Sequence, residues 1–159
     1  MKPLLAFAAL ALLLAPARAA EEHPPHAPGG KETYSSGLSE IMSLQQMRHL
    51  KLWLAGAAKN WPLADYELDE LKEGFDDIAK FFATKDDMPI GQLAGSTAVP
   101  TLPDVKAAID ARDSKKFAAA FDKLTAACNT CHQSTKHEFI VIQRPTSSPY
   151  SNQSFAPKK

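Results

Sequence analysis

The chain has 159 residues, with 18 Lys and Arg against 18 Asp and Glu, so its formal net charge is zero. This length is typical of one domain, and 45% apolar with 23% charged residues excludes a disordered chain and a multi-span membrane protein. Neutrality argues against a nucleic-acid partner, which needs a basic face. The chain has only two cysteines, which excludes a scaffold of several disulfides.

The first nineteen residues have the pattern of a cleaved signal peptide. Lys2 gives a positive start, and the twelve residues from Leu4 to Ala15 carry no polar side chain. Ala17-Arg18-Ala19 then offers the small residues that a signal peptidase requires. An apolar run of this length is too short to cross a bilayer as a helix. We therefore predict that residues 1–19 are removed and that the mature protein is periplasmic without a membrane span; an uncleaved anchor is the alternative.

A flexible leader is predicted at residues 20–36, because Glu21 to Gly30 is rich in proline, glycine and charge. Its two histidines, His23 and His26, could bind a metal ion. Two histidines in a linker are more simply explained as solvated polar side chains.

Two amphipathic helices are predicted next, at residues 37–60 and 63–83. The inward face of the first consists of eight residues: Leu38, Ile41, Met42, Gln45, His49, Leu52, Trp53 and Gly56. The second repeats apolar residues at spacings of three and four: Leu68, Leu71, Phe75, Ile78 and Phe82. Trp61-Pro62 separates the two helices, because proline cannot continue a helix.

The second half of the chain predicts a loop, two helices and a tail. Residues 84–102 are expected to form a loop, since they hold two prolines and two glycines and show no sustained period. A short helix is predicted at residues 103–111, and a long one at residues 114–136 with Ser114 as its N-cap. Residues 137–159 are expected to form an extended tail, whose first residues could pack on the helices.

Together these elements predict an all-α fold. They form a four-helix-bundle-like domain over residues 37–136, with a short third helix and an extended C-terminal tail. We find no internal repeat and no convincing strand pattern.

The decisive motif is Cys128-Asn129-Thr130-Cys131-His132, near the end of the last predicted helix. Cys-x-x-Cys-His is the attachment signature of c-type haem, in which both cysteines bind the porphyrin and the histidine ligates iron. On a helix, positions 128, 131 and 132 are i, i+3 and i+4 and project from one face. We therefore predict one covalent haem c, held by Cys128 and Cys131, with His132 as an axial ligand.

Other uses of the cysteine pair compete with this prediction. A thiol-redox CxxC usually accompanies a βαβ pattern, which this helical sequence lacks. A structural zinc site needs four ligands, and no second cysteine pair or spaced histidine pair completes one. We find no catalytic triad, paired catalytic carboxylates or glycine-rich phosphate loop, so no enzymatic activity is predicted. A helical thiol-redox protein without haem stays as an alternative.

The sixth iron ligand is left open. Met42 and His49 lie on the inward face of the first helix, two turns apart, and Gln45 between them could hydrogen-bond to either. Met47 falls on the other side of that helix, and Met88 lies in the predicted loop. A methionine ligand suits electron transfer, whereas an empty position allows small gases to bind. Each candidate also has an ordinary explanation, because methionines at helical spacing usually fill cores and inward histidines are usually hydrogen-bonded.

Aromatic and basic residues provide two weaker candidates. Seven aromatic side chains could line a haem pocket, although core packing is the stronger explanation for each: Trp53, Trp61, Phe75, Phe81, Phe82, Phe117 and Phe121. Three lysines could form a docking rim for a redox partner, although a solvated helix face explains them better: Lys51, Lys59 and Lys72.

With a signal peptide, a helical domain and CxxCH on its last long helix, the sequence resembles the class II c-type cytochromes, the cytochrome c-prime family. Class I cytochromes c carry the motif near the N-terminus instead. The resemblance covers residues 37–136 and implies a four-helix bundle with Cys128 and Cys131 as attachment sites and His132 as proximal ligand. It also implies that a sixth ligand, where present, is a methionine of the first helix, a place that Met42 matches. The short third helix and the long tail depart from the family pattern.

The predicted function is one-electron transfer in the periplasm by a monohaem c-type cytochrome, through redox partner proteins that the sequence does not identify. The main alternative is a five-coordinate haem that binds nitric oxide or carbon monoxide. A homodimer is left open, because the tail (residues 137–159) could hold a second copy of the chain.

Overall fold

The computed structural model describes residues 37–158. The predicted signal peptide (residues 1–19) and leader (residues 20–36), with His23 and His26, lie outside the described residues. The described chain forms five α-helices and one 3₁₀ turn: α1 (Leu38–Ala57), α2 (Trp61–Phe81), α3 (Ile90–Thr97), η1 (Val99–Thr101), α4 (Leu102–Asp110) and α5 (Ser114–Ser134).

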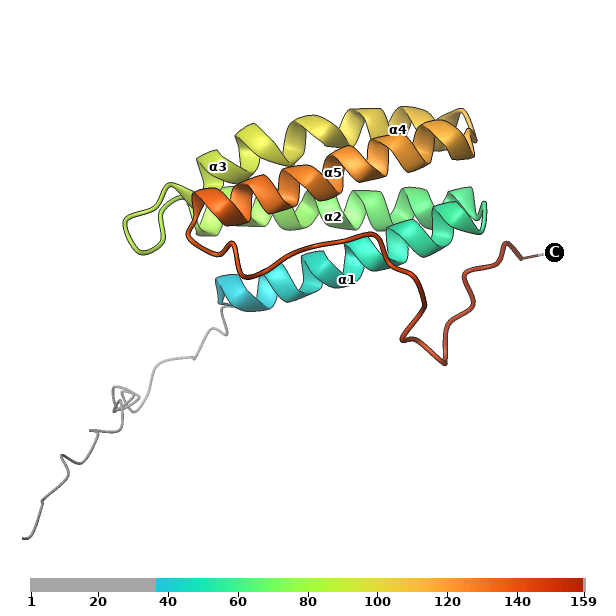
Figure 1. The fold of residues 1–159 in the computed structure, drawn as a ribbon, viewed down its shortest axis with the longest axis horizontal. Helices are drawn as coiled ribbons and strands as arrows, with labels where there is room; N and C mark the ends of the chain where they lie inside the picture. Colours follow the sequence, from blue (N-terminus) through green and yellow to red (C-terminus); the bar gives the residue numbers. More distant parts are fainter. Residues whose placement is uncertain (1–36, 159) are drawn as a thin grey trace, which may run out of the picture. The chain divides into compact units, whose positions relative to one another are not determined.

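The helices pack side by side as a bundle of four helical segments (Figure 1). α1, α2 and α5 are three of these segments. The fourth consists of α3, η1 and α4, which follow one another almost without interruption. No strand occurs between residues 37 and 158, so the predicted all-α, four-helix-bundle-like fold is confirmed. None of the helices in this part of the chain has the length and apolar character needed to cross a membrane.

The prediction of a loop at residues 84–102 is wrong over much of its length, since α3 and η1 lie within it. Gly91 is a site of close packing and not a helix breaker: a Cβ there would lie 3.1 Å from Ala79 Cα and 3.2 Å from Ala83 Cα. The two prolines stand at the N-cap of α3 and in the first turn of η1, where no amide donor is needed. Packing against α2 therefore overrides the low helix propensity of this segment.

Two helix starts also differ from the prediction. α2 begins at Trp61 and not at residue 63, because Pro62 occupies its first turn. Asp113 and not Ser114 caps α5: its carboxylate accepts two hydrogen bonds of 3.0 Å from backbone amides of the first turn. An ionised carboxylate at this end also interacts favourably with the helix dipole.

An aromatic cluster fills the core where α1 ends and α5 begins. The centroid of the Phe117 ring lies 6.1 Å from Trp53, 6.0 Å from Trp61 and 6.1 Å from Phe121. Phe117 and Phe121 are fully buried, and each such burial contributes about 1.5–3 kcal/mol. Phe117 and Phe121 are therefore core residues at the other end of α5 from the CxxCH motif, Trp53 and Trp61 are half-buried and pack against them, and Phe81 is exposed.

Gly56 allows α1 to approach this cluster. A Cβ at that position would lie 2.2 Å from the Phe117 ring. We expect Gly56→Ala to lower the free energy of unfolding by about 1–3 kcal/mol, because overpacking forces the ring or the helix to move. The measurement is urea unfolding, with Gly95→Ala as the control, since nothing lies within 4 Å of a Cβ at that exposed position. Equal stability of the two variants would contradict the expectation.

The tail turns back at the end of α5 and runs beside α5 and α1 (Figure 1). Near its end, Asn60 Nδ2 donates a hydrogen bond of 3.3 Å to the carbonyl of Ala156. Phe139 and Val141 are exposed, whereas Ile142 is half-buried. The described tail is thus attached to the helices at several points along its length.

Candidate functional site

The three chemically active residues of the motif share one face at the C-terminal end of α5. Cys128 and Cys131 are free thiols and half-buried, and His132 is 9% exposed. α5 continues through this polar stretch to Ser134, and the hydroxyls of Thr130 and Ser134 are satisfied by carbonyls one turn earlier, at 3.0 and 2.9 Å. The helical spacing expected for the motif is therefore present.

Burial keeps both thiols protonated at neutral pH. It raises the pKa of Cys128 to about 12, and the neighbouring Cys131 adds to the rise. Burial also raises the pKa of Cys131, and the Thr97 side chain partly offsets this. Thiol–disulfide exchange requires a thiolate, so this environment disfavours the thiol-redox alternative.

His132 has its proton on Nδ1. Nδ1 lies 2.8 Å from the carbonyl oxygen of Ile140, and a carbonyl can only accept, so Nδ1–H is the donor. The Nε2 atom then carries the free lone pair, which is the tautomer that a metal ligand through Nε2 requires. The ring is held in place on one side of α5 with this nitrogen left for another partner.

Met42 lies at the same end of the bundle as His132. α1 and α5 are antiparallel, since the end of α1 packs on the start of α5 in the aromatic cluster. Further along, His49 Nε2 lies 2.8 Å from Thr125 Oγ1. Met42 precedes His49 by seven residues, and His132 follows Thr125 by seven. Because α1 and α5 are antiparallel, both steps lead toward the same end, so Met42 and His132 lie at a similar height along the bundle axis. Met42 is half-buried and packs against the core.

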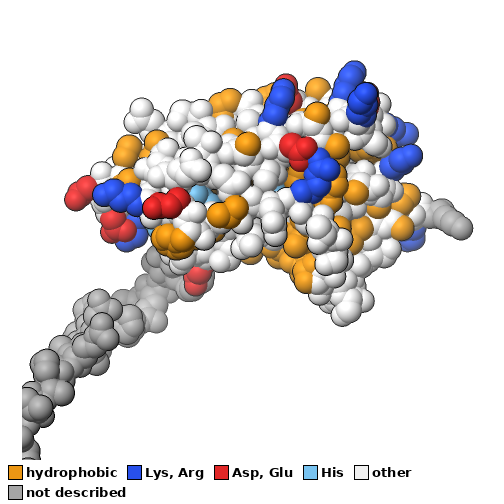
Figure 2. Space-filling view, viewed as in Figure 1, with side chains coloured by type: hydrophobic (Ala, Val, Ile, Leu, Met, Phe, Trp, Pro, Cys, Tyr) orange, Lys and Arg blue, Asp and Glu red, His pale blue; other side chains and the backbone are white. Residues whose placement is uncertain are grey.

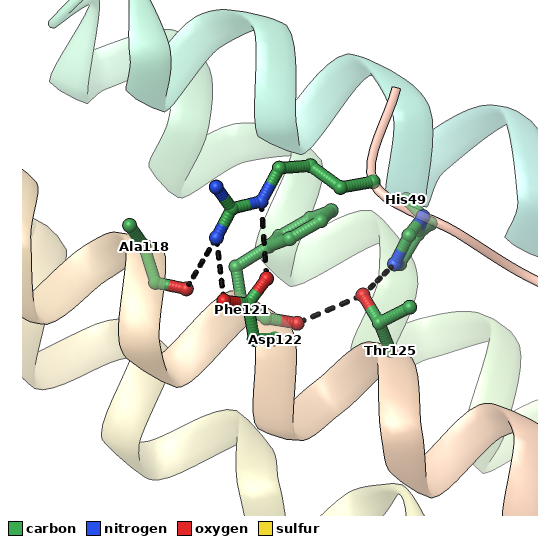
Figure 3. A network of polar contacts seen from close by, with 6 residues as sticks. His49, Ala118, Phe121, Asp122 and Thr125 are labelled. Carbon is green, nitrogen blue, oxygen red and sulfur yellow. Dashed lines mark hydrogen bonds and ion pairs between the residues drawn. The ribbon is translucent and has the colours of Figure 1, made fainter. Parts of the chain in front are cut away.

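His49 is engaged by α5 and leaves no Nε2 lone pair for iron (Figure 3). Thr125 Oγ1 donates to the carbonyl of Phe121 at 2.9 Å, so it accepts from His49 Nε2–H. Gln45, considered as a hydrogen-bond partner for an inward ligand, instead donates to the carbonyl of Leu71 on α2 at 2.7 Å. His49 and Gln45 thus have structural hydrogen bonds that join α1 to its neighbours.

The buried His49 makes stability depend on pH. Burial lowers its pKa from 6.5 to about 4. The unfolded chain therefore takes up a proton before the folded chain does, and the stabilising contribution, complete above pH 6.5, is lost as the pH falls toward 4. We expect the free energy of unfolding to fall by about 3 kcal/mol more in the wild type than in His49→Gln over this range.

Urea unfolding at pH 7, 5.5 and 4 measures the difference. His49→Gln is the suitable comparison, because its amide keeps a donor for Thr125 but does not titrate. Parallel pH profiles of the two proteins would contradict the expectation.

Comparison with known proteins adds no relative to this picture. No family model matches the sequence, and no significant match appears among curated proteins or among solved structures.

The donor set at the end of α5 fits a covalently attached haem. It offers two free thiols at i and i+3 and an imidazole nitrogen with a free lone pair at i+4. Half-buried apolar side chains lie at the same end of the bundle, at the start of α1, at the end of α2 and in the loop after it: Leu38, Met42, Phe82 and Met88. Figure 2 shows histidine and apolar atoms together there, between charged side chains.

The fit rests on this donor set and not on a cavity. Two surface hollows, of about 580 and 330 Å³, lie elsewhere. One is lined by Asn60, Pro62 and tail residues, and the other by residues of α4 and α5 from Asp104 to Lys123. Neither includes a residue of the CxxCH motif.

Two parts of the site were not predicted from the sequence: Asn129 on α5, whose side chain bonds to Ile142, and the tail itself. It supplies the acceptor for His132 through the Ile140 carbonyl, and a backbone carbonyl has no sequence signature. Two of the lysines considered for a docking rim have partners in the structure: Lys72 pairs with Asp76 at 2.6 Å, and Lys51 Nζ lies 5.2 Å from the Tyr150 ring centroid.

Proposed function

We propose that this chain is an exported, monohaem c-type cytochrome that transfers single electrons between redox partner proteins in the periplasm. Cys128 and Cys131 attach the haem, each through addition of its S–H across a vinyl group to give a thioether. His132 Nε2 would ligate the haem iron, and the Met42 thioether would supply a second protein ligand.

One observation carries the proposal: two free thiols and a correctly protonated imidazole stand at i, i+3 and i+4 on one helix face. A disulfide explains the thiols but not the adjacent histidine with its free Nε2. A structural zinc site needs four ligands, and between residues 37 and 158 no group of three or more His, Cys, Asp or Glu side chains is placed to hold a metal ion. The common level of Met42 and His132 on antiparallel helices supports the methionine assignment.

The protein residues have separate tasks. When bound, haem iron supplies a one-electron couple. The two cysteines retain the group in an exported protein, where it cannot be replaced from a cytoplasmic pool. His132 donates Nδ1–H to a carbonyl, which orients the ring and makes Nε2 a stronger donor. A thioether from Met42 would raise the reduction potential relative to an oxygen or nitrogen ligand.

An absorption spectrum of the purified protein, from a host competent in cytochrome c maturation, tests the proposal. We expect sharp low-spin bands on reduction that do not change when carbon monoxide is added. A broad high-spin spectrum that shifts with carbon monoxide would replace electron transfer by gas binding. Absence of any haem bands would contradict the cytochrome assignment itself.

A further inference from the structure

We propose that the first part of the tail, residues 137–144, is a strap that positions the iron-ligating histidine, and that Asn129, inside the motif, is the positioning residue that holds this strap. The inference rests on the proposed function. It assigns a task to a variable position of CxxCH and to a segment beyond the predicted bundle.

The strap begins with a tight turn at the end of α5. The amide of His137 donates to the carbonyl of His132 at 2.7 Å, and the amide of Ile140 donates to the carbonyl of His137 at 2.9 Å. This turn brings the Ile140 carbonyl back over α5, where it accepts from His132 Nδ1 at 2.8 Å. The acceptor for the histidine is thus provided by a residue eight positions further along the chain.

Asn129 holds the strap directly beside this bond. Its side-chain Nδ2 donates to the carbonyl of Ile142 at 2.8 Å, and its Oδ1 accepts from the Ile142 amide at 2.7 Å. The amide side chain thereby pairs with both backbone groups of one strap residue. Two hydrogen bonds at residue 142 limit how far the carbonyl at residue 140 can move, since a single residue separates the two.

Arg144 attaches the far end of the strap. Its guanidinium donates to both carboxylate oxygens of Asp122 and to the carbonyl of Ala118, contacts that Figure 3 shows on α5. It also lies 4.2 Å from the Trp53 ring centroid on α1. The strap is therefore anchored at both ends, and Asn129 is the anchor nearest to His132.

This anchoring matters because Ile140 is 41% exposed. A carbonyl on a free chain end would exchange with water as the partner of Nδ1–H, and the imidazole orientation would vary. A fixed carbonyl keeps the proton on Nδ1 and the lone pair on Nε2, and partners of this kind tune metal affinity by about 10- to 100-fold.

The test compares Asn129→Ala with Thr130→Ala in the purified full-length chain. Thr130 is the matched control: it is the other variable position of the motif, it is exposed, and its hydroxyl bonds only within α5. The first readout is solvent exchange of the His132 Nδ1 proton by NMR, which does not depend on electron-transfer activity. We expect about tenfold faster exchange in Asn129→Ala, since two hydrogen bonds are lost, and no change in Thr130→Ala.

The second readout is the midpoint potential of the haem-loaded protein. A less firmly held acceptor makes His132 a weaker donor to ferric iron, so the potential should rise in Asn129→Ala, by about 59 mV for a tenfold change. Arg144→Gln, which loosens only the far end, should accelerate exchange without disturbing the motif.

The two proposals fail in different ways. If the wild type binds haem but Asn129→Ala has the proton exchange and potential of Thr130→Ala, the strap has no positioning role. If the wild type binds no haem under maturation conditions, the proposed function is overturned, and with it the role of the strap toward iron.

Discussion

Replacing both Cys128 and Cys131 by serine is expected to abolish covalent haem binding completely. Serine keeps the size and the hydrogen-bonding capacity of the thiol but does not form a thioether to the porphyrin. After expression with the cytochrome c maturation apparatus, haem staining of a denaturing gel should label the wild type and leave the double variant unstained. Either single variant, with one thioether left, should stain at reduced intensity.

Thr130→Ala is again the control, because this residue lies between the cysteines and offers no group to the haem. Helix content by circular dichroism separates loss of attachment from loss of fold. Each thiol is half-buried, so the polar replacement should cost only about 1–3 kcal/mol. A folded double variant that still stains would contradict the attachment sites, and an unstained wild type would contradict the cofactor.

The helices that could be predicted are those whose own residues carry the signal. The period of apolar residues in α1, α2 and α5 reports burial along one continuous face, so their existence and approximate bounds follow from sequence. α3 was not predicted, because its helix depends on packing. Gly91 lies against the backbone of Ala79 and Ala83, and a contact between two helices leaves no pattern in the local sequence. The same reason explains why its glycines suggested a loop.

The candidate site divides in the same way. Cys128, Cys131 and His132 are neighbours in sequence, and helical spacing alone puts them on one face. The acceptor for His132 is a backbone carbonyl of the tail, which reaches the histidine only after the chain reverses direction. Asn129, which holds the tail there, occupies a variable position of the motif and has no sequence signal of its own. Local chemistry could be predicted, whereas the contacts that orient it depend on the tertiary fold.

The same limit applies to the polar residues of α1. Their inward position was predicted from periodicity, but periodicity does not distinguish a ligand from a hydrogen-bonding residue. The structure separates them by partner: Gln45 reaches Leu71 and His49 reaches Thr125, whereas Met42 packs among apolar side chains. The hydrogen bond to Thr125 occupies His49 Nε2 and leaves that residue only Nδ1 as a donor atom, whereas the Met42 sulfur has no hydrogen-bonding role on α1.

Met42→Leu is expected to convert a low-spin haem that does not bind carbon monoxide into a high-spin haem that does. Leucine nearly conserves the volume of methionine, so core packing is maintained, but it has no sulfur to ligate iron. The substitution therefore separates the two roles that a half-buried methionine can have. If Met42 only fills the core, the spectrum of Met42→Leu should equal that of the wild type.

The measurement is the reduced absorption spectrum with and without carbon monoxide, together with the midpoint potential. Loss of a thioether ligand should lower the potential, because methionine favours the ferrous state. Met47→Leu is the matched control: it makes the same chemical change on α1, at a half-buried position on another side of the helix. A low-spin spectrum that stays unchanged in Met42→Leu would exclude Met42 and indicate another sixth ligand. A wild type that is already high-spin would exclude Met42 and favour an open iron site.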